Sequence, residues 1–226
     1  MRLGVLFSGG KDSTLALHMA SEKDSVVCLI TVISRNKESY MFHTPNVDVT
    51  GLQAEALGLP LVRVETEGQK EEELADLEKA IRQAKAQYGI EGIVTGAVES
   101  VYQSSRIQRI CNSLDLGCFN PLWMHDQKAL LETLLAKQFQ VIISGVFAYP
   151  LDEKWLGKQL TQDMIERLVA LQAKYGLSPS GEGGEIETTV LDAPLFEQRI
   201  EVTDSAVEWH GSSGVYIIKK AKLTPK

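Results

Sequence analysis

The 226-residue sequence predicts an α/β protein, with a doubly wound parallel sheet followed by a smaller C-terminal α+β part. Three observations predict this class. Continuous apolar runs alternate with helical patterns over the first 150 residues, which is typical of a parallel sheet covered by helices on both faces. A glycine-rich loop separates the first apolar run from the first helical pattern. After Pro150 the alternation ends, so we expect one domain over residues 1–150 and a second region over residues 151–226.

The N-terminal elements follow from hydrophobic periodicity. Strands are expected at five apolar runs, which are residues 3–7, 26–33, 61–64, 93–98 and 141–146. The clearest helix covers residues 71–88, where apolar side chains recur at three- and four-residue steps until Gly89. A second helix is expected over residues 127–137. A parallel sheet of this kind binds ligands at the carboxyl ends of its strands, near the point where the strand order reverses.

The region after Pro150 is expected to contain a helix and a β-hairpin. Residues 161–175 carry apolar side chains on one helical face, and an acidic, glycine-rich loop follows at residues 178–185. Residues 211–214 form the expected hairpin turn, and strands are expected over residues 187–191, 199–209 and 215–223. The exposed edge of such a hairpin could pair two copies of the chain in a homodimer.

Composition narrows the class of protein. The formal net charge of −7 argues against a large nucleic-acid-binding surface, which usually needs a dominant basic face. No apolar run approaches the roughly 20 residues that span a bilayer, and the N-terminus lacks a signal-peptide pattern. We therefore expect a cytoplasmic protein without membrane contact. The three cysteines lack CxxC spacing, so neither a disulfide framework nor a zinc finger is expected.

The loop after the first predicted strand has the composition of an anion-binding site. It consists of Ser8, Gly9, Gly10, Lys11, Asp12 and Ser13. The glycines let backbone N–H groups approach an anion, and the following helix adds unsatisfied donors and a positive dipole end. Lys11 supplies a charge for phosphate, and Asp12 is the candidate ligand for Mg²⁺, which commonly binds one or two carboxylates together with phosphate oxygens. The structural alternative is a glycine turn that caps the helix beside a solvated lysine.

Neighbouring segments extend this predicted nucleotide site. A Walker A loop does not fit, because its first glycine and the serine or threonine after its lysine are absent. Ile33 ends the second predicted strand, and Gly96 and Ala97 lie at the end of the fourth, so these residues are expected to line one crevice. His43 follows the second strand and either contacts the nucleotide or caps the next helix.

A second group of functional residue types lies in the acidic loop and the strand after it. It comprises Glu182, Gly183, Gly184, Glu185, Glu187 and Thr188. The glycines allow the backbone to approach a ligand, and the carboxylates suit a cation, an amine or Mg²⁺. From composition alone, a flexible acidic turn before a strand is the favoured interpretation.

The motifs resemble those of two nested protein families. SGGKDS resembles the PP-loop of the N-type ATP pyrophosphatases, which implies an adenine nucleotide alpha hydrolase-like fold and cleavage of ATP between its α and β phosphates. The whole set resembles the diphthine–ammonia ligase family, and its other motifs are GEGGEIET, YQSSR at 102–106, PLW at 121–123 and WLG at 155–157. These matches cover residues 8–188 in the family's order, although the family often has an aromatic residue where Ile186 stands.

The resemblance implies the last step of diphthamide synthesis. The carboxylate of diphthine, a modified histidine of translation elongation factor 2, would be adenylated by ATP, and ammonia drawn from ammonium would displace AMP. Candidate catalytic residues are Lys11, Asp12, Glu182 and Glu185. Candidate substrate contacts are Tyr102, Gln103, Arg106, Trp123, Trp155, Gly183, Gly184, Glu187 and Thr188.

The residues by themselves are also compatible with different roles. Tryptophans are more often core residues than ligand contacts, and Arg106 suits a helix surface equally well. Another PP-loop enzyme acting on a small carboxylate or on tRNA would share the loop, although thiolation of tRNA would favour a reactive cysteine and a basic surface. A regulatory module could hold ATP without chemistry. Lys11 and Asp12 together favour an enzyme, because binding alone needs no group for a leaving pyrophosphate.

Overall fold

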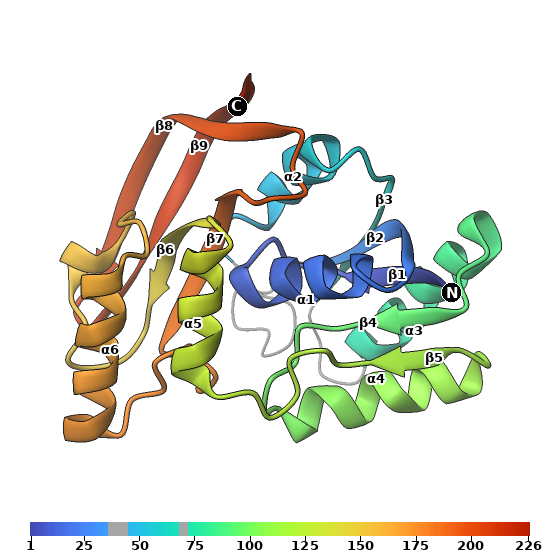
Figure 1. Cartoon of the computed structure of the whole chain (residues 1–226), viewed down its shortest axis with the longest axis horizontal. Helices are drawn as coiled ribbons and strands as arrows, with labels where there is room; N and C mark the ends of the chain where they lie inside the picture. The colour runs from blue at the N-terminus through green and yellow to red at the C-terminus, as the bar shows by residue number, and fades with distance from the viewer. Residues whose placement is uncertain (36–44, 68–71) are drawn as a thin grey trace.

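The computed structural model describes residues 1–35, 45–67 and 72–226, which form two sheets with helices around them (Figure 1). The first sheet is parallel, with the strand order β3-β2-β1-β4-β5. Its strands are β1 (Arg2–Leu6), β2 (Ser25–Ser34), β3 (Leu61–Thr66), β4 (Gly92–Val94) and β5 (Gly117–Phe119). The strand order reverses at β1 and β4, so the carboxyl ends of these two neighbours flank the switch point.

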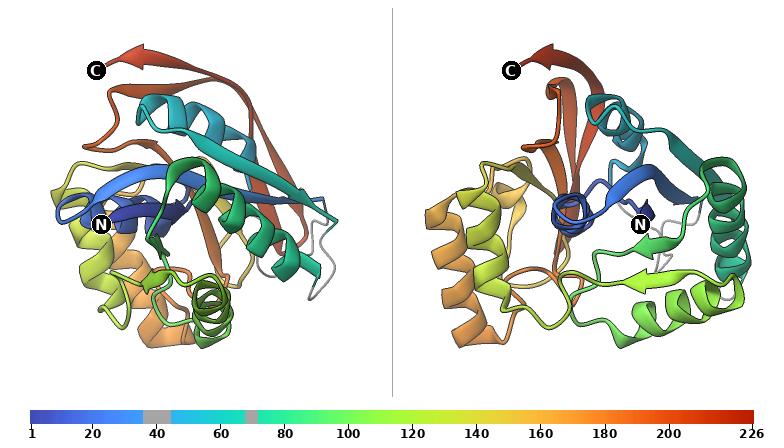
Figure 2. Two further views of the ribbon diagram at one scale, coloured as in Figure 1. Left: turned by 90° about the vertical axis from the view of Figure 1, so that its right-hand side faces the viewer. Right: turned by 45° about the vertical axis from the view of Figure 1, so that its right-hand side comes forward.

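Helices cover both faces of the parallel sheet, as the alternation of side chains along β2 shows. Leu29 joins the cluster that includes the helices α1 (Lys11–Ser21) and α2 (Thr50–Ala56). Cys28 and Ile30 join the cluster of α3 (Glu72–Tyr88) and α4 (Val101–Ser113). Successive side chains of a strand point to opposite faces, so the two clusters lie on opposite sides of the sheet (Figure 2). The predicted doubly wound α/β class is confirmed.

The second sheet is antiparallel, with the order β7-β6-β9-β8. Its strands are β6 (Gln140–Val146), β7 (Ile186–Asp192), β8 (Gln198–His210) and β9 (Ser213–Pro225). The helices α5 (Gln127–Ala136) and α6 (Gln162–Tyr175) pack beside it (Figure 1). One continuous core joins this sheet to the face of the parallel sheet that carries α1, because Val5, Leu17, Ile143 and Leu168 belong to a single buried cluster.

The sequence-based assignment of residues 141–146 to the parallel sheet is wrong. They form β6, which pairs antiparallel with β7 and β9 in the second sheet. A continuous apolar run indicates a strand that is buried on both faces. It does not show whether the neighbouring strands run parallel or antiparallel, so a central strand of either sheet has the same pattern. The fifth parallel strand is instead β5, a three-residue element with no extended apolar run.

The predicted helices and hairpin are confirmed. Thr161 caps α6 by accepting from the Met164 N–H at 3.3 Å, and Gly176 ends this helix with a φ of +71°. The predicted helix over residues 71–88 is α3, and the predicted hairpin is formed by β8 and β9. The described residues also include two short 3₁₀ helices, η1 (Val47–Val49) and η2 (Glu153–Trp155). Within the described ranges, every helix falls short of the length and hydropathy that crossing a bilayer requires.

Candidate active site

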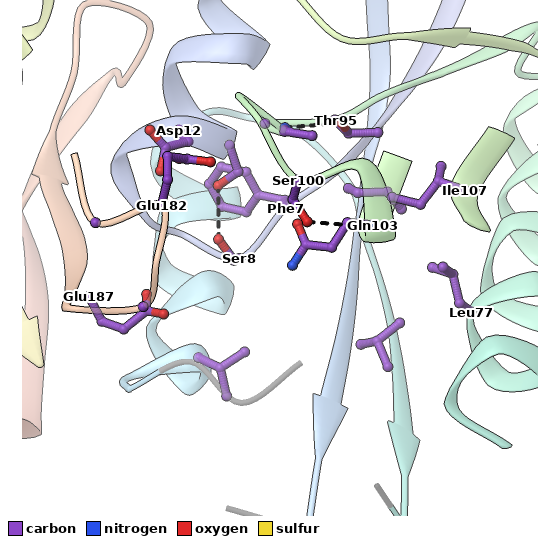
Figure 3. Close-up of a pocket in the computed structure, with 18 of the residues that line it drawn as sticks. Phe7, Ser8, Asp12, Leu77, Thr95, Ser100, Gln103, Ile107, Glu182 and Glu187 are labelled. Carbon is purple, nitrogen blue, oxygen red and sulfur yellow. Dashed lines mark hydrogen bonds between the residues drawn. The ribbon is translucent and has the colours of Figure 1, made fainter. Parts of the chain in front are cut away.

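A cavity of about 290 Å³ lies at the switch point of the parallel sheet (Figure 3). Its walls come from the loop after β1, the ends of β2 and β4, the start of α4, and the acidic loop before β7. Its polar lining includes Ser8, Asp12, Ser13, Thr95, Ser100, Gln103, Glu182 and Glu187. Its apolar lining includes Leu6, Ile30, Val32, Val47, Leu77 and Ile107. One end therefore offers hydroxyls and charges, and the remainder suits a flat apolar group such as a purine base.

The loop between β1 and α1 is shaped for an anion. Gly9 has a φ of +79°, a conformation that favours glycine. The hydroxyls of Ser8 and Ser13 lie 3.2 Å apart beside the first turn of α1. An α-helix leaves its first N–H groups without intrahelical acceptors, so the backbones of Asp12 and Ser13 present donors near the cavity.

Lys11 stands within a group of three carboxylates. Its side chain is 5% exposed, and its Nζ lies 2.7 Å from Asp12 Oδ2. Burial disfavours the charged lysine, but the fields of Asp12, Glu182 and Glu187 outweigh it and raise the pKa of Lys11. Burial, and then the negative charge of Asp12, raises the pKa of Glu182 to about 7. Burial also raises the pKa of Glu187 to about 7, against the opposing charge of Lys11. The site thus combines a permanent cation with two carboxyl groups that titrate near neutrality.

Glu185 folds the acidic loop. Its Oε1 accepts from the Ser178 N–H at 2.9 Å, and its Oε2 accepts from the Gly183 N–H at 2.9 Å. Gly181 and Gly184 both have φ values of +80°, which lets the loop turn twice within a few residues. With Glu185 occupied in this way, Glu182 and Glu187 are the two glutamates of this motif that line the cavity.

Gln127, at the start of α5, holds the same loop from outside. Its Oε1 accepts from the Ser178 hydroxyl at 2.6 Å, from the Ser180 hydroxyl at 2.9 Å and from the Ser180 N–H at 3.2 Å. Glu182 then accepts from the backbone N–H of Glu99 at 3.3 Å. These bonds fix Glu182 beside the turn that leads into α4, with its side chain next to Asp12 of the predicted phosphate loop (Figure 3).

Close backbone packing joins the two loops. A Cβ atom on Gly10 would lie 3.2 Å from the Thr188 carbonyl, in the strand after the acidic loop. A Cβ atom on Gly96 would lie 2.7 Å from both the Asp12 carbonyl carbon and the Ser13 nitrogen. The 2.7 Å contacts require glycine at position 96, so the turn after β4 can lie directly against the first turn of α1, and the Gly10 contact leaves little room for a side chain.

Both halves of the chain match models of one protein family. The N-terminal domain of diphthamide synthase matches residues 1–118, and the C-terminal domain matches residues 126–224. The chain belongs to the diphthamide synthase family. A relative from Mus musculus named diphthine–ammonia ligase is 36% identical over 99% of this chain and 91% of its own length. The relative of that name from Homo sapiens is 35% identical over 94% of this chain and 86% of its own length.

A third relative is longer than this member of the diphthamide synthase family. The diphthine–ammonia ligase of Schizosaccharomyces pombe is 36% identical over 97% of this chain, which spans only 39% of that relative's length. The predicted family and the predicted class of enzyme, a ligase, are confirmed by these matches.

Several residues predicted as site residues, from strand ends or from family motifs, lie outside the cavity lining. The lining includes Val32 rather than its neighbour Ile33, because alternate side chains of β2 face opposite sides. In the YQSSR motif, Gln103 lines the cavity, whereas the guanidinium of Arg106 stacks 3.5 Å from the ring centre of Tyr102. Ala97 also lines the cavity.

The two predicted tryptophans lie outside the cavity lining as well. Trp155 is buried in the core with the Arg167 guanidinium 4.7 Å from its ring centre, and Trp123 is half-buried in the turn before α5. His43 lies outside the described residues. These tryptophans, placed by the family motifs, thus contribute to packing in the described structure.

Sequence patterns did not indicate Gln53, Ser100 or Gln127 as site residues, whereas Thr95 was expected in the crevice with Gly96 and Ala97 at the end of the fourth predicted strand, and it lines the cavity. Thr95 Oγ1 accepts from the Ala97 N–H at 3.1 Å and donates to Asn120 Oδ1 at 2.6 Å. Ser100 caps α4 by accepting from the Gln103 N–H at 3.3 Å. A serine directly before a helical run, such as Ser100, is a typical helix N-cap. The isolated glutamines Gln53 and Gln127 match no such sequence pattern.

The donor set is compatible with Mg²⁺ bound jointly with phosphates. In the described part of the chain, no three His, Cys, Asp or Glu side chains are grouped to hold a metal by themselves. Asp12 lines the cavity beside the predicted phosphate site. One carboxylate supplemented by phosphate oxygens and water is a common Mg²⁺ environment, so Asp12 fits a Mg²⁺ ion bound together with a nucleotide.

Proposed function

We propose that the chain amidates diphthine on translation elongation factor 2 to diphthamide in the cytoplasm. ATP activates the diphthine carboxylate as an acyl-adenylate, ammonium supplies the nitrogen, and AMP and pyrophosphate are released. The observation that carries this proposal is the shared cavity. It joins the predicted phosphate loop at residues 8–13 to the acidic loop from the C-terminal part, so ATP and a carboxylate substrate can meet there.

The first step needs charge stabilisation at the phosphates. An oxygen of the diphthine carboxylate attacks the α-phosphorus of ATP, and the bond to the β-phosphate bridging oxygen breaks. Lys11, which pairs with Asp12 of the cavity lining, and the N–H groups of Asp12 and Ser13 at the start of α1 would stabilise the charge that the leaving pyrophosphate gains. Asp12 would hold Mg²⁺, which offsets phosphate charge.

The second step needs a proton acceptor. Ammonium gives one proton to Glu187, and the resulting ammonia attacks the acyl carbon. The bond to the AMP oxygen breaks, and the surplus proton on nitrogen passes to Glu182. Their pKa values of about 7 suit proton transfer near neutral pH. Glu185 holds the acidic loop in shape, because both of its carboxylate oxygens accept hydrogen bonds from backbone N–H groups of that loop.

Phosphorus NMR tests the proposal. ATP, Mg²⁺, ammonium and elongation factor 2 bearing authentic diphthine are incubated with the protein, and each component is omitted in turn. Free AMP should appear only in the complete mixture, whereas pyrophosphate should also appear, at most in the amount of the acyl-adenylate formed, where ammonium alone is missing. Mass spectrometry should show the amide only when ammonium is present. AMP and pyrophosphate without amide in the complete mixture would redirect the search to another acceptor. Intact ATP in every mixture would overturn the proposal.

A further inference from the structure

Gln53 of α2 is fully buried and binds the phosphate loop from behind. Its Nε2 donates to the Gly9 carbonyl at 2.8 Å and to the Val190 carbonyl of β7 at 2.8 Å. The Gly9 carbonyl also accepts from the Val190 N–H at 3.0 Å. One carbonyl of the phosphate loop is therefore held by two donors, one from α2 and one from β7.

Because the peptide bond is planar, the hydrogen bonds that hold the Gly9 carbonyl also set the direction of the Gly10 N–H. In a trans peptide, the carbonyl of one residue and the N–H of the next point in opposite directions. Because the Gly9 carbonyl points toward Gln53 and β7, the Gly10 N–H points the other way. It donates to Ser8 Oγ at 3.4 Å, and Ser8 lines the cavity.

We infer that Gln53 is a positioning residue for the phosphate site, which aims the Gly10 N–H at the Ser8 hydroxyl on the wall that would face the leaving pyrophosphate. The inference rests on the proposed function, because that function makes residues 8–13 the pyrophosphate site. The direction of the Gln53 amide is determined by its surroundings, since a flipped amide would aim its oxygen at two carbonyls.

A buried oxygen without a hydrogen-bond donor among the described residues indicates that Gln53 has a role beyond packing. Gln53 Oε1 is buried and accepts no hydrogen bond from the described residues. An apolar side chain of the same size would fill the space without a buried, unpaired oxygen. A Cβ atom on Gly9 would overlap that oxygen, so the glutamine and the glycine fit each other.

Calorimetry on the full chain tests the inference. Pyrophosphate, ATP and AMP are titrated into wild type, Gln53→Met, Gln53→Glu and the control Gln83→Leu, which changes an exposed glutamine of α3. Gln53→Met keeps the length of the side chain and removes both donors. We expect affinity for pyrophosphate and ATP to fall about tenfold, with AMP affinity changed less than twofold, because two hydrogen bonds that orient the loop are lost. Gln53→Glu, which aims an acceptor at the same carbonyls, should weaken both further.

The outcomes separate the two proposals. AMP binding shows that each variant is folded, so a selective loss of pyrophosphate and ATP supports the positioning role. Equal weakening of all three ligands in a variant that keeps the wild-type unfolding transition, or unchanged affinity for all three, overturns it while leaving the proposed function standing. Wild-type protein that binds neither ATP nor pyrophosphate would overturn both.

Discussion

The backbone N–H of Lys11 donates to the hydroxyl of Thr188 over 3.1 Å, across a separation of 177 residues. Lys11 begins α1 at the phosphate loop, and Thr188 lies in β7, directly after the acidic loop. Thr188 therefore caps the first helix from the other end of the chain. This hydrogen bond connects the two family motifs, so a substitution in one motif should affect the structure of the other.

Thr188→Val should uncouple the motifs. Valine has nearly the shape of threonine but accepts no hydrogen bond, which leaves the Lys11 N–H buried and unpaired. We expect the free energy of unfolding to fall by about 1–3 kcal/mol, with weaker ATP binding. Urea denaturation and calorimetry measure the two effects, and Thr188→Ser, which keeps the hydroxyl, is the matched control. A valine variant equal to wild type in both would show that the bond is unimportant.

Lys11→Ala should abolish pyrophosphate release. The side chain is almost fully buried against Asp12, and alanine removes its charge from the proposed phosphate site. We expect activity to fall by at least 100-fold, in line with the loss of a main electrostatic contact in a transition state. A coupled pyrophosphate assay measures it, with the exposed Lys128→Ala as the control. Near-normal turnover would remove Lys11 from the proposed mechanism.

The raised pKa of Glu187 predicts how stability depends on pH. A carboxyl whose pKa is raised from 4.5 to about 7 in the folded protein favours folding when protonated. Its contribution is full below pH about 4.5 and is lost as the pH rises through about 7. Glu187→Gln should therefore stabilise the ligand-free protein at pH 8, by on the order of 1–3 kcal/mol, and much less at pH 4.5.

Urea denaturation at several pH values checks this slope, with the exposed Glu208→Gln as the control. Wild type should lose stability between pH 4.5 and pH 7 more steeply than the Glu187 variant. Parallel curves would mean that Glu187 ionises with an ordinary pKa in the folded protein.

Glu185→Gln should impair amide formation more than ATP binding. Glutamine has one acceptor oxygen where the carboxylate uses two, so either the Ser178 or the Gly183 N–H loses its partner. The acidic loop should then hold Glu182 less firmly, and we expect amidation to fall about tenfold while the Kd for ATP changes little. Single-turnover assays with Glu201→Gln as the control separate the steps. Unchanged amidation would show that the acidic loop has no role in amide formation and is only a structural turn.

Local pattern was enough to predict some elements. The helix α3 repeats apolar side chains at helical spacing, and the phosphate loop carries glycine, lysine and serine in close succession. Both signals are contained within one segment of chain, so neither depends on distant residues. The hairpin of β8 and β9 is equally local.

Other features depend on contacts between distant segments. The composition of β6 is the same whether its partners are parallel or antiparallel, and β7 and β9 follow it only after a long stretch of chain that includes α6. Gln53 and Gln127 are single polar residues whose partners come from the phosphate loop, β7 and the acidic loop. Nothing in their local sequence distinguishes them from exposed glutamines. The site could thus be predicted at its two motifs but not at the residues that hold the motifs together.

Gly96→Ala tests the packing between β4 and α1. The added Cβ would lie 2.7 Å from two backbone atoms of the first turn of α1, and backbone cannot move aside as a flexible side chain can. We expect the free energy of unfolding to fall by about 1–3 kcal/mol and ATP affinity to fall with it, because the loop must shift where it faces phosphate. Gly51→Ala is the matched control. It lies in α2 with its nearest neighbour 3.9 Å from the added Cβ, so it should be neutral or stabilise by about 0.5–1 kcal/mol. Thermal denaturation and ATP titration compare the two variants, and equal behaviour would show that β4 and α1 can separate without cost to the site.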